Sequence, residues 1–179
     1  MSLRTRALAL TVVAAVGGGL ALTASPASAS VSQGWFSGSG DPSNDWGDEG
    51  TLSASSHARS NATALVQMLL WADGAKEQNG TAFDWSDIDG KYGPNTTYAV
   101  KSWQKLYNSR LGARLVVDGK AGPKTLGAAD VSLYADGGTV TFQGWKHDVT
   151  FKRSGGKYYL KVNNSRGWKL ASYSTLNVV

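Results

Sequence analysis

Apolar residues recur at helical spacing near the middle of the chain. The apolar positions between residues 60 and 72 that lie three or four apart are Leu65, Met68, Leu69 and Ala72. This spacing predicts an amphipathic helix over 60–72. Ser60 or Asn61 can cap its free amides, and Gly74 can take the left-handed conformation that ends a helix.

Two further helices are predicted downstream. The first runs from Pro94 to about Tyr107, because its apolar and aromatic residues fall on one face. A short third helix runs from Pro123 to about Ala129. Proline suits the first position of each helix, where its missing N–H would have had no partner.

Each of these two helices is preceded by a copy of the same turn motif. Asp89-Gly90-Lys91-Tyr92-Gly93-Pro94-Asn95-Thr96 returns as Asp118-Gly119-Lys120-Ala121-Gly122-Pro123-Lys124-Thr125. Asp-Gly supplies a side-chain acceptor and a positive φ, and proline fixes the first helical φ. The repeat therefore predicts three helices joined by two similar turns.

The last part of the chain changes to the two-residue alternation of strands. Four runs show it, at 139–142, 148–152, 158–162 and 168–173. Glycine-rich or asparagine-rich turns separate them, as in hairpins. We predict an antiparallel sheet of four or five strands, one face of which packs on the helices, and hence an α+β fold.

Composition divides the chain into four segments. A basic start, an apolar run and the small residues Ala27 and Ala29 predict a secretory signal peptide over 1–29. An acidic segment rich in glycine and serine follows at 30–54, a helical domain at 55–130 and a basic β-rich region at 131–179. No later segment is apolar enough to predict a membrane span, so no membrane contact is expected once the signal is removed.

The segment 30–54 shows neither helical nor strand periodicity, which predicts a flexible linker. Its aromatic residues are the exception. Trp35, Phe36 and Trp46 either pack back on a domain or wait for a partner.

Charge and cysteine content limit the chemistry. The chain has no cysteine, which excludes disulfides, thiol nucleophiles and iron–sulfur clusters. The acidic segment holds four acids and no base, whereas 131–179 holds seven bases against two acids. A basic exported surface is drawn to carboxylates and phosphates.

The helical segment resembles a known family. Asp89-Gly90-Lys91-Tyr92-Gly93-Pro94-Asn95-Thr96, then Ala99-Val100 and Trp103-Gln104, is similar to the motif of the peptidoglycan-binding domain found beside many cell-wall hydrolases. The second copy at 118–125 and the first-helix pattern at 65–70 agree with it in order. The resemblance covers about 55–130 and departs from the family pattern in a longer loop over 76–85.

The resemblance implies binding of bacterial cell-wall peptidoglycan, with a pocket near the turns. Together with the predicted signal peptide, and with only about 49 residues left for a catalytic domain, it leads us to expect a secreted, non-catalytic wall-binding protein. Asp89, Lys91, Tyr92 and Asp118 are the contacts it suggests. The partner would be peptidoglycan or an associated anionic wall polymer, aided by the basic β-region. Nucleic acid is not expected to be a partner of an exported chain.

Two copies of Gly-Trp-Lys stand in the β-rich region. Trp145 and Trp168 can stack on sugar rings, and the neighbouring lysines can meet carboxylates or phosphates. Both are candidate ligand-binding residues. The alternative is that both rings fill the core or pair across strands.

No catalytic constellation stands out. His57 and His147 have no metal-ligand spacing, and no serine lies in a nucleophile elbow. We therefore predict no catalytic residue, no metal and no cofactor. Two other functions stay open: a secreted inhibitor or protein-binding protein that reuses the fold, and a small wall hydrolase or its accessory subunit.

Overall fold

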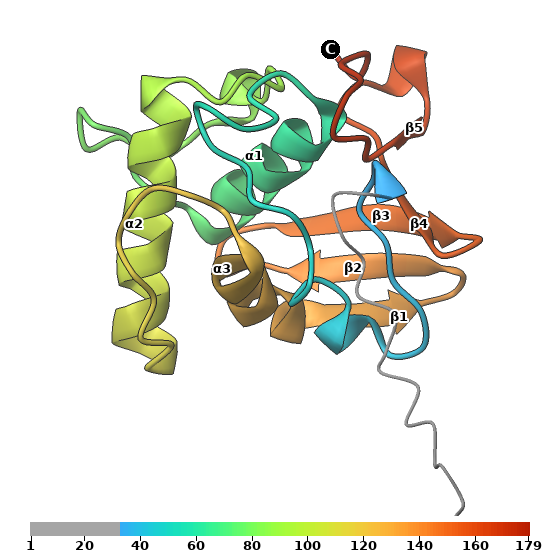
Figure 1. Ribbon diagram of the computed structural model, residues 1–179, viewed down its shortest axis with the longest axis horizontal. Helices are drawn as coiled ribbons and strands as arrows, with labels where there is room; N and C mark the ends of the chain where they lie inside the picture. The colour runs from blue at the N-terminus through green and yellow to red at the C-terminus, as the bar shows by residue number, and fades with distance from the viewer. Residues whose placement is uncertain (1–32) are drawn as a thin grey trace, which may run out of the picture.

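The computed structural model describes residues 33–179, so the predicted signal peptide lies outside the described residues. Three helices are followed by a five-stranded antiparallel sheet, which confirms the α+β prediction. The helices are α1 (Asn61–Asp73), α2 (Pro94–Leu111) and α3 (Pro123–Ala129). In Figure 1, α1 and α3 lie against the sheet, and α2 stands at the side of the molecule.

The predicted helix ends are close to the observed ones. Ser60 caps α1, since its hydroxyl accepts a hydrogen bond of 3.0 Å from the Thr63 amide. Gly74 ends α1 in the left-handed conformation with φ 66°. Helix α2 continues one turn beyond the predicted Tyr107 and stops at Gly112, which has φ 64°. Glycine is favoured at both ends because other residues rarely adopt this φ.

The spacing predicted that α1 is amphipathic, but in the structure this helix is buried on nearly every side. Trp71 is the one residue of this helix that is not buried. The polar faces of α1 are covered because the C-terminal tail crosses its start: the Asn61 amide donates to the Thr175 carbonyl and the Ala62 amide to that of Ser172. Carbonyl groups from the tail thus satisfy donors that a helix start leaves unpaired.

The sheet contains the four predicted runs and one strand more. Its order follows the sequence, and each neighbouring pair is antiparallel. The strands are β1 (Leu133–Asp136), β2 (Thr139–Gln143), β3 (Asp148–Ser154), β4 (Lys157–Leu160) and β5 (Lys169–Leu170). Alternate residues of the middle strands, among them Phe142, Phe151 and Tyr158, are fully buried on the face toward the helices. On the opposite face, Asp148, Thr150 and Lys152 of β3 are exposed, whereas Lys157 and Tyr159 of β4 are half-buried.

Residues 33–54 are packed on the sheet, contrary to the flexible linker that their composition predicted. The amide of Phe36 donates to the Ala171 carbonyl, and the Tyr158 amide donates to the Phe36 carbonyl. Phe36 and Trp46 have no exposed surface. The burial of these two side chains stabilises the docked segment, which has no hydrophobic periodicity that would predict a helix or a strand. The alternative that these rings pack back on a domain holds for Phe36 and Trp46.

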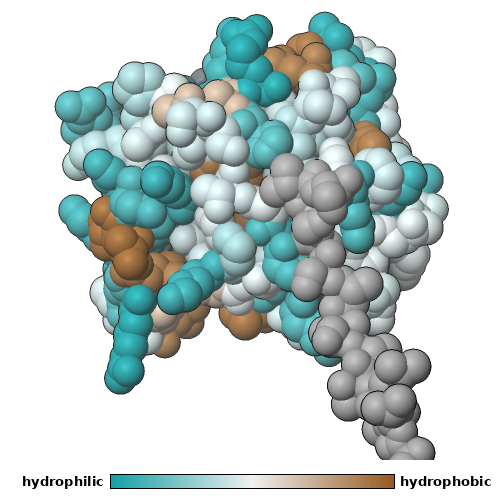
Figure 2. Space-filling view, in the orientation of Figure 1, coloured by the Kyte–Doolittle hydropathy of each residue, from teal (hydrophilic) through white to brown (hydrophobic). Residues whose placement is uncertain are grey.

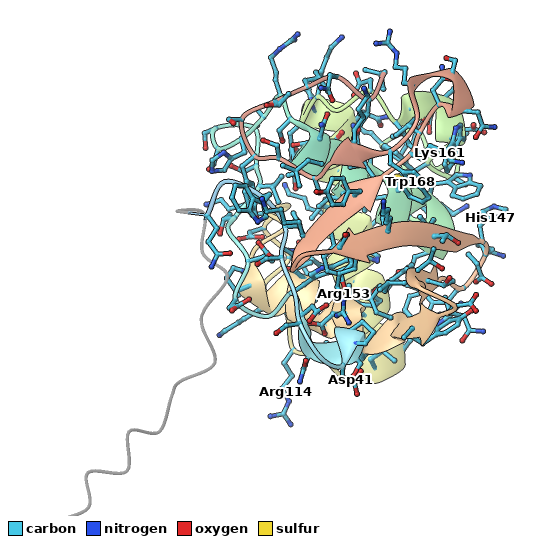
Figure 3. All side chains as sticks on the ribbon, turned by 90° about the vertical axis from the view of Figure 1, so that its right-hand side faces the viewer. Asp41, Arg114, His147, Arg153, Lys161 and Trp168 are labelled. Carbon is cyan, nitrogen blue, oxygen red and sulfur yellow. The ribbon has the colours of Figure 1, made fainter. Side chains whose placement is uncertain are left out.

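The acids of this segment bind the basic sheet. Asp45 accepts hydrogen bonds from the guanidinium of Arg153 and from the hydroxyl of Tyr158. The guanidinium also donates to the Gly40 carbonyl, near Asp41 (Figure 3). Glu49 accepts from the Ser37 amide and from the Tyr173 hydroxyl, each at 2.6 Å. The opposite charges of the two segments are therefore partly neutralised within the fold.

Buried Glu49 makes stability fall as pH rises. Burial raises the pKa of Glu49 to about 7, so the folded protein holds a proton there that the unfolded chain releases near pH 4.5. The stabilisation is complete below about pH 4.5 and is lost through pH 7. We expect the free energy of unfolding to drop by about 3 kcal/mol over this range because of Glu49. Urea unfolding at a series of pH values measures it.

Glu49→Gln is the control for that prediction, because glutamine keeps the shape and cannot ionise. The slope of unfolding free energy against pH should become shallower in this variant between pH 5 and 7. An unchanged slope would show that another group causes the dependence. Asp130 is a second contributor, since burial raises its pKa to about 6.

The buried hydrophobic residues of the described chain form one cluster from Phe36 to Val178. Figure 2 shows scattered groups of hydrophobic residues at the surface. The hydrophobic residues that are at least half exposed include Leu111 at the end of α2, Val116 in the connection to α3 and Val131 after α3. Within residues 33–179, no helix is both long and apolar enough to span a bilayer.

Candidate functional site

The duplicated turns are held by two equivalent glutamines. The side-chain amide of Gln67 donates to the Asp89 carboxylate (2.9 Å), the Lys91 carbonyl and the Thr96 hydroxyl, and its carbonyl accepts from the Gly90 amide (2.7 Å). Gln67 is 1% exposed. This amide therefore ties the whole first turn to α1.

Gln104 repeats the arrangement at the second turn. Its amide donates to the Asp118 carboxylate (2.9 Å), the Lys120 carbonyl and the Thr125 hydroxyl, while its carbonyl accepts from the Gly119 amide (3.0 Å). The Asp, Gly and Thr of each motif thus serve one buried network. This network explains the spacing of the repeat in physical terms.

The predicted turn contacts have internal partners. Asp89 and Asp118 accept hydrogen bonds from the glutamines, and Tyr92 is 3% exposed with its hydroxyl donating to the Gly119 carbonyl. Of the four, Lys91 and Asp118 are exposed, and the Asp118 carboxylate is engaged by Gln104. Pockets of about 330 and 350 Å³ lie beside the two turns. The turns adjoin each other through Tyr92.

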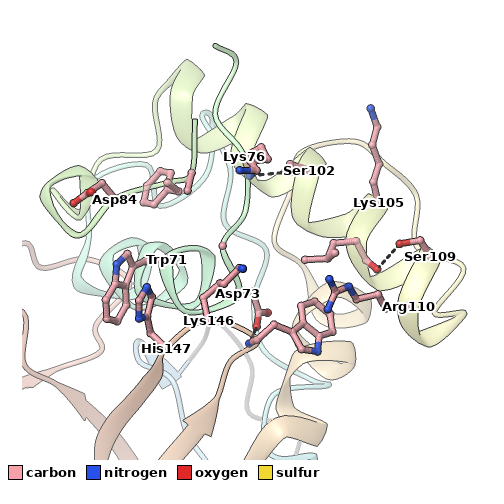
Figure 4. Close-up of a pocket in the computed structure, with 15 residues that line it drawn as sticks. Trp71, Asp73, Lys76, Asp84, Ser102, Lys105, Ser109, Arg110, Lys146 and His147 are labelled. Atoms are coloured by element: carbon pink, nitrogen blue, oxygen red, sulfur yellow. Dashed lines mark hydrogen bonds between the residues drawn. The ribbon is translucent and has the colours of Figure 1, made fainter. Parts of the chain in front are cut away.

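A larger cleft of about 770 Å³ lies between the helices and the β2–β3 connection (Figure 4). It is bordered by the end of α1, the loop that follows it, one face of α2 and residues 145–147. Its polar and aromatic lining residues are Trp71, Asp73, Lys76, Phe83, Asp84, Ser102, Lys105, Ser109, Arg110, Trp145, Lys146 and His147. Of the sequence-predicted site residues, Trp145 lies here.

Asp73 joins the three walls of the cleft. One carboxylate oxygen accepts hydrogen bonds from the indole of Trp103 (2.6 Å) and the hydroxyl of Tyr107 (2.8 Å), both on α2. The other oxygen accepts from the Trp145 amide at 3.1 Å. Burial raises the pKa of Asp73, and the three donors oppose that shift. Asp73 is 4% exposed, so it positions the walls and is hardly open to a ligand.

The β2–β3 connection docks on the C-terminal end of α1. The amides of Lys146 and His147 both donate to the Ala72 carbonyl, at 2.9 and 3.0 Å. Gly144 permits this approach, because a Cβ there would lie 2.5 Å from the same carbonyl oxygen. The unpaired carbonyl at the helix end thus fixes Trp145, Lys146 and His147 beside the helical domain.

Aromatic rings and cations line this cleft. Trp71 stacks on His147 with ring centroids 4.1 Å apart and an interplanar angle of 8°. The guanidinium of Arg110 lies 4.9 Å from the centroid of the Trp145 ring. Lys76, Lys105 and Lys146 add exposed cations, against the exposed carboxylate of Asp84. The cleft therefore favours an anionic ligand that also has apolar faces.

Trp168 lies elsewhere, on the open face of the sheet. It is 37% exposed, and the Lys161 ammonium lies 5.2 Å from its ring centroid. The two Gly-Trp-Lys copies therefore have different surroundings, one at the cleft and one on the sheet. The structure does not bring Trp145, Trp168 and the turn residues into one site.

Several residues that line the cleft were not predicted from the sequence. Trp71 lies outside the apolar stripe of the predicted first helix. A large ring at such a position indicates that it faces solvent or a cleft. Lys105 and Arg110 carry no motif and are brought to the cleft only by the packing of α2. Within residues 33–179, no group of His, Asp and Glu is arranged to hold a metal ion.

A comparison with family models agrees with this architecture. Residues 59–128 match the model described as "Putative peptidoglycan binding domain". The resemblance seen in the sequence is thereby confirmed for the segment that contains α1, α2, α3 and both turns. No curated protein and no solved structure matched the chain. The match covers less than half of the chain, and the sheet lies outside it.

Proposed function

We propose that the protein is a secreted, non-catalytic binder of bacterial cell-wall peptidoglycan. The single observation that carries the proposal is the cationic, aromatic cleft between the peptidoglycan-binding domain and the β2–β3 connection. Peptidoglycan combines sugar rings with peptides that carry carboxylates. The cleft offers ring faces at Trp71 and Trp145 and cations at Lys105, Arg110 and Lys146 for these two kinds of group.

The turns contribute less to this proposal than the cleft does. Asp89, Tyr92 and Asp118 are engaged in hydrogen bonds within the fold, and Lys91 is the member best placed to meet a ligand. The basic sheet would assist by attracting anionic wall material. Secretion is inferred from the predicted signal peptide.

Reversing two charges of the cleft should weaken wall binding. In Lys105→Glu/Lys146→Glu we expect the affinity for purified insoluble peptidoglycan sacs to fall by roughly tenfold or more, because two attractive contacts become repulsive. Co-sedimentation at low salt over a range of protein concentrations measures this. Binding of the wild-type protein should also weaken as salt is added.

The matched control is Arg59→Glu/Arg114→Glu, which makes the same change in net charge at exposed positions outside the cleft. Its binding should stay within about twofold of wild type, since only long-range attraction changes. Equal losses in both double variants would reject the cleft as the site. Release of soluble muropeptides by the purified protein would reject the non-catalytic part of the proposal.

A further inference from the structure

A second cationic surface lies on the open face of the sheet, away from the cleft. In β4 the side chains of Tyr158 and Leu160 are buried toward the helices, so Lys157, Tyr159 and Lys161 point to the other side. Lys152 of β3 is paired directly with Tyr159 and shares its face. Successive residues on one face of a strand lie about 7 Å apart. Lys157 and Lys161 therefore lie on either side of Tyr159, and Lys152 lies beside Tyr159 on the neighbouring strand, so that the three lysines form a row.

Each of these lysines lies over an aromatic ring. The Lys157 ammonium is 4.1 Å from the centroid of Trp35, that of Lys161 is 5.2 Å from Trp168, and that of Lys152 is 6.0 Å from Tyr159. Figure 3 shows Lys161 and Trp168 side by side. A cation held over a ring face loses little further side-chain freedom when an anion arrives. The rings therefore preorganise the ammonium groups.

Among the residues that the structure describes, no ion pair joins a carboxylate to this row, although Asp136 and Asp148 lie on the same face of the sheet. Residues 149–179 contain no Asp or Glu. The ion pair of Arg153 with Asp45 lies on the opposite face. Lys152, Lys157 and Lys161 thus lie on a stretch of sheet surface with no carboxylate bonded to them.

We propose that this lysine row binds a linear phosphodiester polymer of the cell wall. The charged groups in the row are ammonium ions, and the nearest guanidinium of the strands, Arg153, is turned inward to Asp45. Lysine is a common phosphate ligand, because an ammonium binds phosphate as a point charge from any side, whereas the two-pronged guanidinium demands a fixed orientation of a carboxylate or phosphate. An open row of such charges suits a flexible polyanion better than a compact ligand.

The proposal extends the proposed function to a second polymer through a separate surface. Its test uses the triple variant Lys152→Gln/Lys157→Gln/Lys161→Gln and soluble poly(glycerol phosphate) as the probe. We expect the affinity to fall by roughly tenfold or more, and the slope of log affinity against log salt to become about 2 smaller in magnitude, as for three lost phosphate contacts. The control is Arg59→Gln/Lys101→Gln/Arg114→Gln, which removes three exposed cations of the helical domain and should bind as wild type does.

Two results would overturn the proposal. One is unchanged binding of poly(glycerol phosphate) by the triple variant. The other is wild-type binding of polyglutamate as tight as that of the phosphate polymer, which would show unspecific charge attraction. Wall sacs stripped of phosphodiesters by acid keep the two proposals apart. The triple variant should bind stripped sacs normally, whereas Lys105→Glu/Lys146→Glu should not.

Discussion

Replacing Gln104 by leucine is expected to lower the free energy of unfolding by about 3–5 kcal/mol. Leucine fills the same space but can make none of the four hydrogen bonds that join the side chain of Gln104 to the second turn. The Gly119 amide and the Thr125 hydroxyl lie in buried residues. Each group left without a partner costs about 1–3 kcal/mol, and such costs are not fully additive.

Urea unfolding of Gln104→Leu measures the loss, and two further variants interpret it. Gln104→Glu keeps the shape but replaces the donor by an oxygen that faces the Asp118 carboxylate, so it should be destabilised as strongly. Gln78→Leu changes an exposed glutamine and should stay within about 0.5 kcal/mol of wild type. A Gln104→Leu protein within 1 kcal/mol of wild type would show that the network contributes little.

The equivalent change at Gln67 should have a similar cost, because the two networks use the same groups. Gln67 also holds the amides of Asp89 and Gly90 through its carbonyl. A motif that is repeated for a structural reason should be equally sensitive at both copies. A large loss at one copy and none at the other would instead favour a local function for the tolerant turn.

Local rules account for most of the elements that the sequence predicted. The helix starts at Pro94 and Pro123 and the end at Gly74 were predictable because they depend on a residue's own φ preference and its missing or present N–H. The hairpins followed from glycine pairs between alternating runs. The domain resemblance was predictable because its motif is a continuous segment whose side chains bond within it.

The cleft could not be predicted because its walls come from distant parts of the chain. Trp71, Lys105 and Lys146 meet only after the β2–β3 connection has docked on the Ala72 carbonyl. The residues next to Asp73 in the sequence do not predict that it accepts hydrogen bonds from α2 and from Trp145. Such contacts depend on tertiary packing, which no local pattern encodes.

The sequence contained an indication that residues 33–54 pack on the sheet, but the composition of the segment favoured the opposite prediction. Glycine, serine and aspartate predicted a flexible segment, whereas Trp35, Phe36 and Trp46 and the opposite charges of this segment and the sheet indicated docking. The burial of two large rings was the stronger effect. Burying an aromatic side chain contributes about 1.5–3 kcal/mol, enough to order several residues when hydrogen bonds accompany it.

Replacing Trp46 by alanine is expected to destabilise the protein by about 3–5 kcal/mol. The ring has no exposed surface and contacts the rings of Phe36, Phe151 and Tyr158, with centroids 5.3–5.9 Å apart. Its loss would leave a cavity between the sheet and the segment 33–54. That segment should then become sensitive to proteases at concentrations that leave the wild-type protein intact.

Trp46→Phe separates ring packing from the indole group. The indole N–H of Trp46 is the one buried side-chain polar atom without a hydrogen-bond partner among the described residues. Phenylalanine removes that unpaired donor while keeping an aromatic ring, so we expect Trp46→Phe to lose less than half of what Trp46→Ala loses. Trp35→Ala, at a partly exposed ring, should cost at most about 1 kcal/mol. If Trp46→Ala unfolded at the wild-type urea concentration, the Trp46 ring would contribute little to the core, and residues 33–54 would be held by Phe36 and by the hydrogen bonds of Asp45 and Glu49.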